Sequence, residues 1–243
     1  MGHTTGRRHL RRLAAPKTWP IPRKGTYWVV KPNPGPHSME LSMPIALWIR
    51  DYLKYAQTLR EVKYILNHNK VYVDGKPIKD YKYPVGLFDV IWFPDLDEYW
   101  RVLINEKGKL YLKRIDEKEA WIKPLRIKRK QMVNGGKVQL TLFDGRNVVV
   151  DDAKKYKTGD TLVLDLKEKK IIDHIPMEKG VTLFFYYGAK VGTLGILEEI
   201  KILHKPYGHT RFVVYKDYKT GEIKETIWDY AYVVGREKPI IEI

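Results

Sequence analysis

Length, composition and charge set the first limits. The chain has 243 residues, 44% of them hydrophobic, which is enough for one large domain or two to three small ones with real cores. It has no cysteine, which excludes a disulfide framework, a thiolate nucleophile and a cysteine zinc site, and its longest apolar run, VTLFFYY at 181–187, is too short to cross a bilayer.

Positive charge is concentrated toward the N-terminus, within a formal net charge of +16. Residues 1–39 hold eight lysines and arginines and no acid, residues 40–159 hold 24 basic and 16 acidic residues, and residues 160–243 hold 13 of each. Such a protein binds nucleic acid, an anionic membrane or an acidic protein, and counterion release from phosphates favours nucleic acid.

The first 40 residues are predicted to be a basic, proline-rich extension. Its cations in the stretch GRRHLRRLAAPKTW, residues 6–19, are Arg7, Arg8, Arg11, Arg12 and Lys17. A transit peptide or a disordered tail is an alternative, but prolines interrupt any helix, and Trp19 and Trp28 indicate an anchored segment. We expect an arm that inserts its arginines between phosphates and orders only on binding nucleic acid. Deleting residues 2–17 should then flatten the salt dependence of binding and leave the Tm nearly unchanged.

Two short helices and a hairpin are predicted next. Ser42 is a candidate cap for a first helix, and apolar residues recur at helical spacing from Ile45 to Ala56. Thr58 and Glu61 form a capping box for a second helix. The hairpin 71–78 turns at Asp74-Gly75, and a strand over 85–93 completes a compact α+β unit.

Beyond residue 105 the pattern predicts strands almost throughout. Expected strands lie at 138–143, 146–150, 161–166, 169–175, 211–218 and 222–228, with one short helix at 116–121. Short strands joined by turns favour two small barrels or open sheets over a parallel α/β domain.

Motifs of catalysis are absent from the sequence. It lacks a nucleophile elbow, a Walker loop, a dinucleotide fingerprint and a paired-histidine metal motif, and His204 and His209 are interpreted as surface loop residues. The sequence therefore offers no catalytic constellation and no metal-binding motif.

Eight cations of the helix–hairpin unit fall at positions that the apolar pattern leaves exposed. They are Arg50, Lys54, Arg60, Lys63, Lys70, Lys76, Lys79 and Lys82. Residues 45–90, IALWIRDYLKYAQTLREVKYILNHNKVYVDGKPIKDYKYPVGLFDV, resemble the S-four RNA-binding module. Where that module carries Gly-Lys-Val before its hairpin, this chain has Asn69-Lys70-Val71, and asparagine tolerates the left-handed backbone that the turn needs.

Residues 179–200, KGVTLFFYYGAKVGTLGILEEI, resemble a KOW motif, which is a strand, a glycine loop and a second strand in an SH3-like barrel. The turn glycines are Gly75 in the hairpin above and Gly188, Gly192 and Gly195 in this loop. Lys190 is the loop's one cation and a candidate RNA contact, so a purely structural role for this barrel is an open alternative.

The arm HLRRLAAPKTW, the GPH turn at 35–37, the S-four module and the KOW segment closing with YVVGREKP together resemble the archaeal and eukaryotic small-subunit ribosomal protein S-four-e family. The resemblance implies a multidomain, mainly β fold. Its parts are a basic extension (1–40), an S-four (αL-type) RNA-binding domain (41–104), a central β domain (105–175) and a KOW barrel (176–243).

The same resemblance implies a cytoplasmic constituent of the small ribosomal subunit that binds small-subunit rRNA and neighbouring ribosomal proteins. It implies no catalytic activity, no cofactor, no metal, no small-molecule substrate and no membrane. An RNA-modifying enzyme with an S-four appendage and a KOW-bearing transcription factor are the alternatives.

Overall fold

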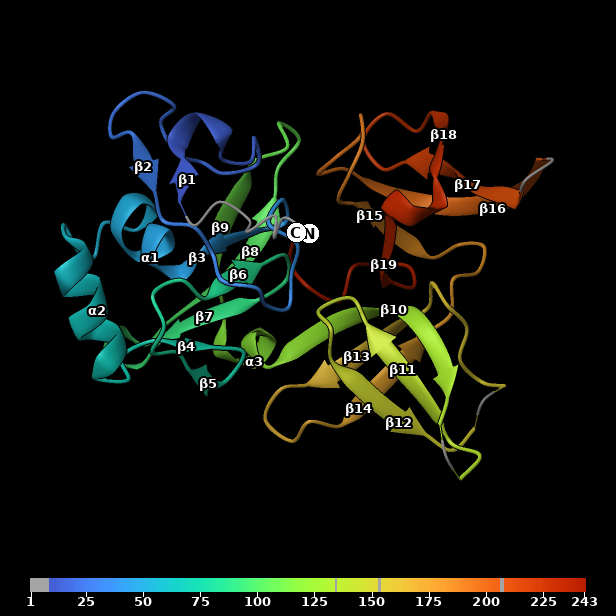
Figure 1. Ribbon diagram of the computed structural model, residues 1–243. Coiled ribbons are helices and arrows are strands. Elements are labelled where there is room, and N and C mark those ends of the chain that lie inside the picture. Colours follow the sequence, from blue (N-terminus) through green and yellow to red (C-terminus); the bar gives the residue numbers. More distant parts are fainter. Residues whose placement is uncertain (1–8, 134, 153, 206–207) are drawn as a thin grey trace, which may run out of the picture. The chain divides into compact units, whose positions relative to one another are not determined.

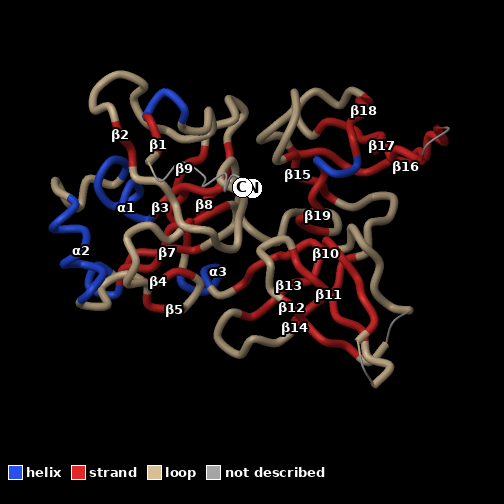
Figure 2. The backbone as a smooth tube through the Cα atoms, viewed as in Figure 1, coloured by secondary structure: helices blue, strands red, loops and turns tan. Residues whose placement is uncertain are grey.

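The computed structural model describes residues 9–133, 135–152, 154–205 and 208–243, which divide into two compact units (Figure 1). The first unit extends to Leu103 and includes Lys109–Ile115, and the second comprises Ile104–Gly108 and Asp116–Ile243. Strands greatly outnumber helices along the chain (Figure 2). The fold is therefore mainly β with a small helical part, as predicted.

The described part of the arm is folded onto the first unit. Strand β1 (Leu10–Arg11) pairs antiparallel with β2 (Trp28–Val29), and a 3-10 turn, Arg12–Ala14, follows β1. Trp19 is fully buried, and its indole Nε1 donates to the Ser42 carbonyl over 2.7 Å. The expectation that the arm orders only on binding nucleic acid is therefore wrong for these residues, and deletion of residues 2–17 should lower the Tm.

The first predicted helix begins later and ends earlier than expected. It consists of α1 (Ile45–Leu47) and a π-helical turn, Trp48–Tyr52, and it has no side-chain cap. Ser42 instead lies in β3 (Ser42–Pro44), where its backbone pairs with Gly86 of β6 (Pro84–Gly86). Lys54, with φ +59°, then turns the chain away from the helical path before Ala56.

The second helix, α2 (Leu59–Asn67), confirms the predicted capping box. The Glu61 amide donates to Thr58 Oγ1, and the Glu61 carboxylate accepts from the Thr58 amide. Two residues past the helix end, Asn69 has φ +53°, the left-handed conformation expected where the S-four module has glycine.

A five-stranded sheet of order β5-β4-β7-β8-β9 completes the first unit. Its strands are β4 (Tyr72–Val73), β5 (Lys76–Pro77), β7 (Val90–Phe93), β8 (Glu98–Ile104) and β9 (Leu110–Ile115), with a 3-10 turn at Pro94–Leu96. The single strand expected over 85–93 is two strands, β6 and β7. Buried Phe88 interrupts them with φ +66°, and its amide donates to the Val102 carbonyl.

The second unit contains two five-stranded sheets. The central sheet, of order β12-β11-β10-β13-β14, contains β10 (Ile122–Met132), β11 (Val138–Leu142), β12 (Asn147–Val150), β13 (Thr161–Asp165) and β14 (Ile171–Ile175), and α3 (Glu117–Ala120) precedes it. The C-terminal sheet, of order β18-β17-β16-β15-β19, contains β15 (Thr182–Phe185), β16 (Leu194–Lys205), β17 (Gly208–Asp217), β18 (Ile223–Ile227) and β19 (Ala231–Gly235), with a 3-10 turn at Trp228–Tyr230. The strands and short helix predicted beyond residue 105 are confirmed, and the pairing is antiparallel in both sheets.

The two sheets of this unit share a core. Val163 and Ile175 of the central sheet pack with Leu183 and Val233 of the C-terminal sheet. The Tyr232 hydroxyl accepts from the Arg126 amide over 2.8 Å and donates to the Pro124 carbonyl over 3.0 Å. These bonds satisfy a buried hydroxyl and fix β19 against β10.

Candidate nucleic-acid interface

The arm's cations have different environments. Arg7 and Arg8 lie outside the described residues. Arg11 and Lys17 are exposed, and the Arg11 guanidinium lies 5.5 Å from the Tyr27 ring centroid. Arg12 is buried and donates to the carbonyls of Pro22 and Thr26 and to the Thr26 hydroxyl. Its guanidinium therefore holds the arm's loop together within the protein.

Most of the cations predicted on the helix–hairpin unit lie at the surface. The exposed ones are Lys54, Arg60, Lys63, Lys76 and Lys79. Lys63 and the half-buried Lys82 place their ammonium groups 4.8 and 5.5 Å from the Tyr81 ring centroid. Tyr81 thus brings two cations from different segments together at one place.

Two predicted cations are bound to neighbouring acids. Arg50 Nε and Nη2 donate to the Asp51 carboxylate over 2.8 and 2.9 Å, and this hydrogen bonding raises the Arg50 pKa. Lys70 lies 2.7 Å from Asp95, whose hydrogen bond raises the Lys70 pKa. A phosphate at Lys70 would have to share or displace Asp95, and one at Arg50 has to use the guanidinium edge that Asp51 leaves open, so both positions are secondary candidates for RNA contact.

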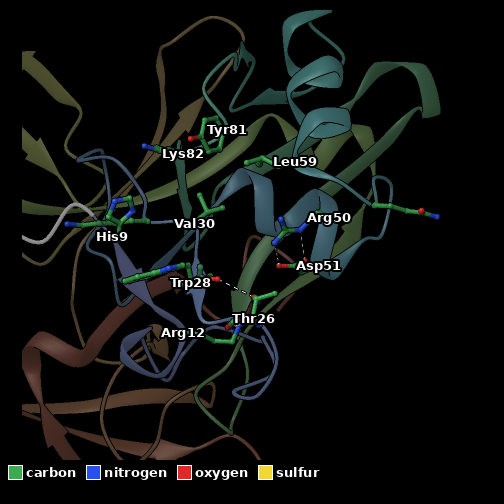
Figure 3. Close-up of a pocket in the computed structure, with 13 residues that line it drawn as sticks. His9, Arg12, Thr26, Trp28, Val30, Arg50, Asp51, Leu59, Tyr81 and Lys82 are labelled. Carbon is green, nitrogen blue, oxygen red and sulfur yellow. Dashed lines mark hydrogen bonds and ion pairs between the residues drawn. The ribbon is translucent and has the colours of Figure 1, made fainter.

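A hollow of about 640 Å³ opens between the arm and the helices of the first unit (Figure 3). Its lining comprises His9, Arg12, Thr26, Trp28, Val29, Val30, Lys31, Arg50, Asp51, Gln57, Leu59, Tyr81 and Lys82. Among these, His9, Trp28, Lys31, Gln57 and Tyr81 are absent from the sequence-based site. Aromatic and basic residues adjoin in residues 79–83, KDYKY, and Tyr27-Trp28 lies between Lys24 and Lys31; this pattern could have indicated Trp28, Lys31 and Tyr81. No local pattern indicates His9 or Gln57.

The GPH turn has a structural explanation. His37 Nε2 lies 2.9 Å from Asp89 Oδ1 with both side chains almost fully buried, and the other Asp89 oxygen accepts from the Gly86 amide. A Cβ on Gly86 would lie 2.4 Å from the His37 ring, and one on Gly35 would lie 2.4 Å from Pro84. The turn is therefore packed directly on β6.

The KOW-like loop uses its glycines for packing. Gly188 and Gly192 have φ of +85° and +77°, and a Cβ on Gly192 would lie 2.3 Å from the Asn105 carbonyl carbon. Gly195 was expected in the loop but lies in β16, where a Cβ would lie 2.4 Å from the Tyr215 ring. Gly75, with φ +73°, occupies the hairpin turn as predicted. Lys190 is exposed in the loop.

Several cations of the C-terminal sheet are paired with acids within the second unit. Lys224 lies 2.7 Å from buried Asp217, and Lys219 pairs with Glu106. The hydrogen bond from Lys224 lowers the Asp217 pKa. These pairs agree with the balanced charge of residues 160–243.

A basic segment of the central sheet was missed. Lys128, Arg129 and Lys130 are exposed in the second half of β10, where the register with β11 shifts between Ile127 and Arg129. The run of three cations in the sequence was the available signal. Lys130 donates to the Tyr156 carbonyl over 2.9 Å, which ties its side chain to the following loop.

The described part of the chain has neither a metal site nor a membrane-spanning helix. No group of three His, Asp or Glu side chains there is arranged to hold a metal ion. None of the helices described is long and apolar enough to span a membrane.

Family models match three consecutive segments. An RS4NT domain matches residues 4–40, an S4 domain matches residues 43–91, and the ribosomal family S4e matches residues 96–171. These three matches define the class of the protein: a modular ribosomal protein that contains an S4 domain.

Whole-chain relatives agree with this class. A protein of Nanoarchaeum equitans named small ribosomal subunit protein eS4 is 50% identical to this chain. The match covers 92% of this chain and 93% of the relative. The proteins of the same name in Pyrobaculum arsenaticum and Methanosphaera stadtmanae are 46% and 41% identical to this chain. These matches cover 97% and 100% of this chain, and 98% of each relative. The crystal structure of the 30S ribosomal protein S4e from Thermoplasma acidophilum has a TM-score of 0.67 and 30% identity, covering 80% of this chain and 95% of its own. The chain belongs to the S4e family of ribosomal proteins, which confirms the family predicted from the sequence.

Proposed function

We propose that the protein is a structural constituent of the small subunit of cytoplasmic ribosomes, where it binds small-subunit rRNA and supports subunit assembly and translation. The observation that carries this proposal is the 50% identity over 92% of the chain to a protein named small ribosomal subunit protein eS4. This role requires neither catalysis nor a cofactor, a metal or a small-molecule substrate.

The first unit supplies the main RNA-binding surface. Its proposed contacts are Arg7, Arg8, Arg11, Lys17, Lys54, Arg60, Lys63, Lys76, Lys79 and Lys82, with Arg50 and Lys70 as secondary contacts and Arg12 as a positioning residue. Phosphate contacts and shape account for binding to helical RNA, because its deep, narrow major groove does not admit side chains. Neutralising phosphates releases counterions, so the affinity falls as salt rises.

We further propose four functional parts: a basic extension (1–40), an S-four domain (41–104), a central β domain (105–175) and a KOW/SH3-like barrel (176–243). The strand order of the C-terminal sheet, with β15 and β16 around the glycine loop, supports the last assignment. Its paired charges favour neighbouring ribosomal proteins or solvent over RNA, with Lys190 as the one RNA contact that we propose there.

Co-sedimentation tests this function against its alternatives. The tagged full-length chain, expressed in a related archaeon, should sediment with small ribosomal subunits in a sucrose gradient, at stoichiometric amounts after a high-salt wash. Recovery with RNA polymerase would instead support a transcription factor. Recovery with free tRNA, together with a changed nucleoside, would support an RNA-modifying enzyme.

A further inference from the structure

An exposed tryptophan lies at the hollow between the arm and the helices. Trp28 is 52% exposed, although its neighbour on β2, Val29, is buried. Together with His9 and Lys31, it lines both the 640 Å³ hollow and a second hollow of about 440 Å³. Water thus reaches a large aromatic surface that the fold holds in place by the β1–β2 pairing.

The charge in the hollow is predominantly positive. Lys31, Arg50 and Lys82 contribute cations, and Asp51 is the acid among the lining residues. Asp51 occupies the guanidinium edge of Arg50 that carries Nε and Nη2, so Nη1 lies on the other edge. An arginine binds phosphate through a free edge of its guanidinium group, and a lysine ammonium binds phosphate as a point charge.

We propose that this hollow binds one unpaired nucleotide of the RNA, with its base stacked on Trp28 and its phosphate held by Arg50 and Lys82. A base within a duplex is already stacked on both faces, so only a bulged, looped or flipped nucleotide can present its face to the indole. Gln57 and His9, which also line the hollow, supply hydrogen-bonding groups for the edge of the base. The inference rests on the proposed function and adds to it a preference for an unpaired nucleotide.

Two RNA hairpins test the proposal with the full-length chain. One is fully paired and the other carries a single unpaired nucleotide in the same stem, and both are compared with refolded small-subunit rRNA. We expect wild type to prefer the bulged hairpin by about tenfold, the scale of one base–aromatic stack. Trp28→Leu should lose that preference and bind the paired hairpin as before, while Trp28→Phe should retain most of it.

Tyr218→Leu is the matched control, because Tyr218 is 53% exposed in the second unit and lies outside the hollow. Equal Tm values of the variants establish that folding is intact. If Trp28→Leu keeps the wild-type preference, or if ultraviolet crosslinks from Trp28 in assembled subunits reach a protein instead of a nucleotide, the proposal is overturned. Failure of wild type to bind small-subunit rRNA would instead refute the proposed function itself.

Discussion

The helix–hairpin unit and the C-terminal sheet are both rich in lysine and arginine but use them differently. In the first unit, Lys63 and Lys82 both lie over the Tyr81 ring; Lys63 is exposed to solvent and Lys82 lines the hollow. In the C-terminal sheet, Lys224 of β18 and Lys219 of the turn before it are paired with acids of their own unit. The number of cations is therefore a poor guide to an RNA-binding surface, and their partners within the fold are a better one.

The two tryptophans of the arm, Trp19 and Trp28, should differ most in how much their replacement lowers the unfolding free energy. Trp19→Ala removes a fully buried indole and its hydrogen bond to Ser42, so we expect a loss of about 3–5 kcal/mol in unfolding free energy. Trp28→Ala, at an exposed site, should cost less than about 1 kcal/mol. Urea denaturation measures both. Equal losses would mean that the arm is not docked through Trp19.

Glycines of the C-terminal sheet test whether its loop serves packing. Gly192→Ala combines a positive φ with a backbone clash at Asn105, so it should destabilise the second unit by about 2 kcal/mol or more. Gly180→Ala has φ +91° and open space for the methyl group, so it should cost only about 1 kcal/mol. Thermal unfolding compares the two. A Gly192→Ala protein of normal stability and reduced rRNA affinity would support an RNA-binding loop.

Replacing Asn69 should lower the stability by a smaller amount, through local backbone strain alone. Alanine at its left-handed position should cost about 1 kcal/mol, because the methyl group is strained there. Asn67→Ala, at the exposed end of α2, should change stability by about 0.5 kcal/mol or less. Chemical denaturation of the two variants side by side checks this, and a harmless Asn69→Ala would remove the reason for asparagine in the turn.

The Lys224–Asp217 pair should give the smallest effect, visible only in acid. Because the folded-state pKa of Asp217 is lowered, the carboxylate stabilises the fold above its unfolded pKa of about 3.9 and loses that contribution as the pH falls further. Lys224→Gln should flatten the fall in Tm below about pH 4. Lys216→Gln, at an exposed neighbouring position, is the control, and identical acid profiles for both would contradict the pairing.

Features set by neighbouring residues were predictable from the sequence, and features set by distant partners were not. The Thr58–Glu61 capping box and the left-handed turn at Asn69 depend on a few consecutive residues, and both are confirmed. Ser42 was misassigned because its backbone pairs with Gly86, and Phe88 because its amide bonds to Val102.

The same distinction applies to the candidate site. The sequence locates the exposed cations of α2, Arg60 and Lys63, and Lys76 of the hairpin, because the helical and strand periods leave them off the buried face. Burial of Arg12 depends on carbonyls of Pro22 and Thr26 across a loop, and the hollow around Trp28 depends on the docking of the arm. Neither follows from local spacing.

Salt-dependent rRNA binding by two charge-neutralised variants tests the central claim most directly. The first variant carries glutamine at four exposed cations of the first unit, Lys54, Arg60, Lys63 and Lys79. The second carries glutamine at four exposed cations of the second unit, Lys190, Lys201, Arg211 and Lys216. If the first unit carries the RNA-binding surface, the first variant should bind at least about tenfold more weakly with a shallower salt slope, and the second within about twofold of wild type. Equal weakening, or a greater loss in the second variant, would contradict the account.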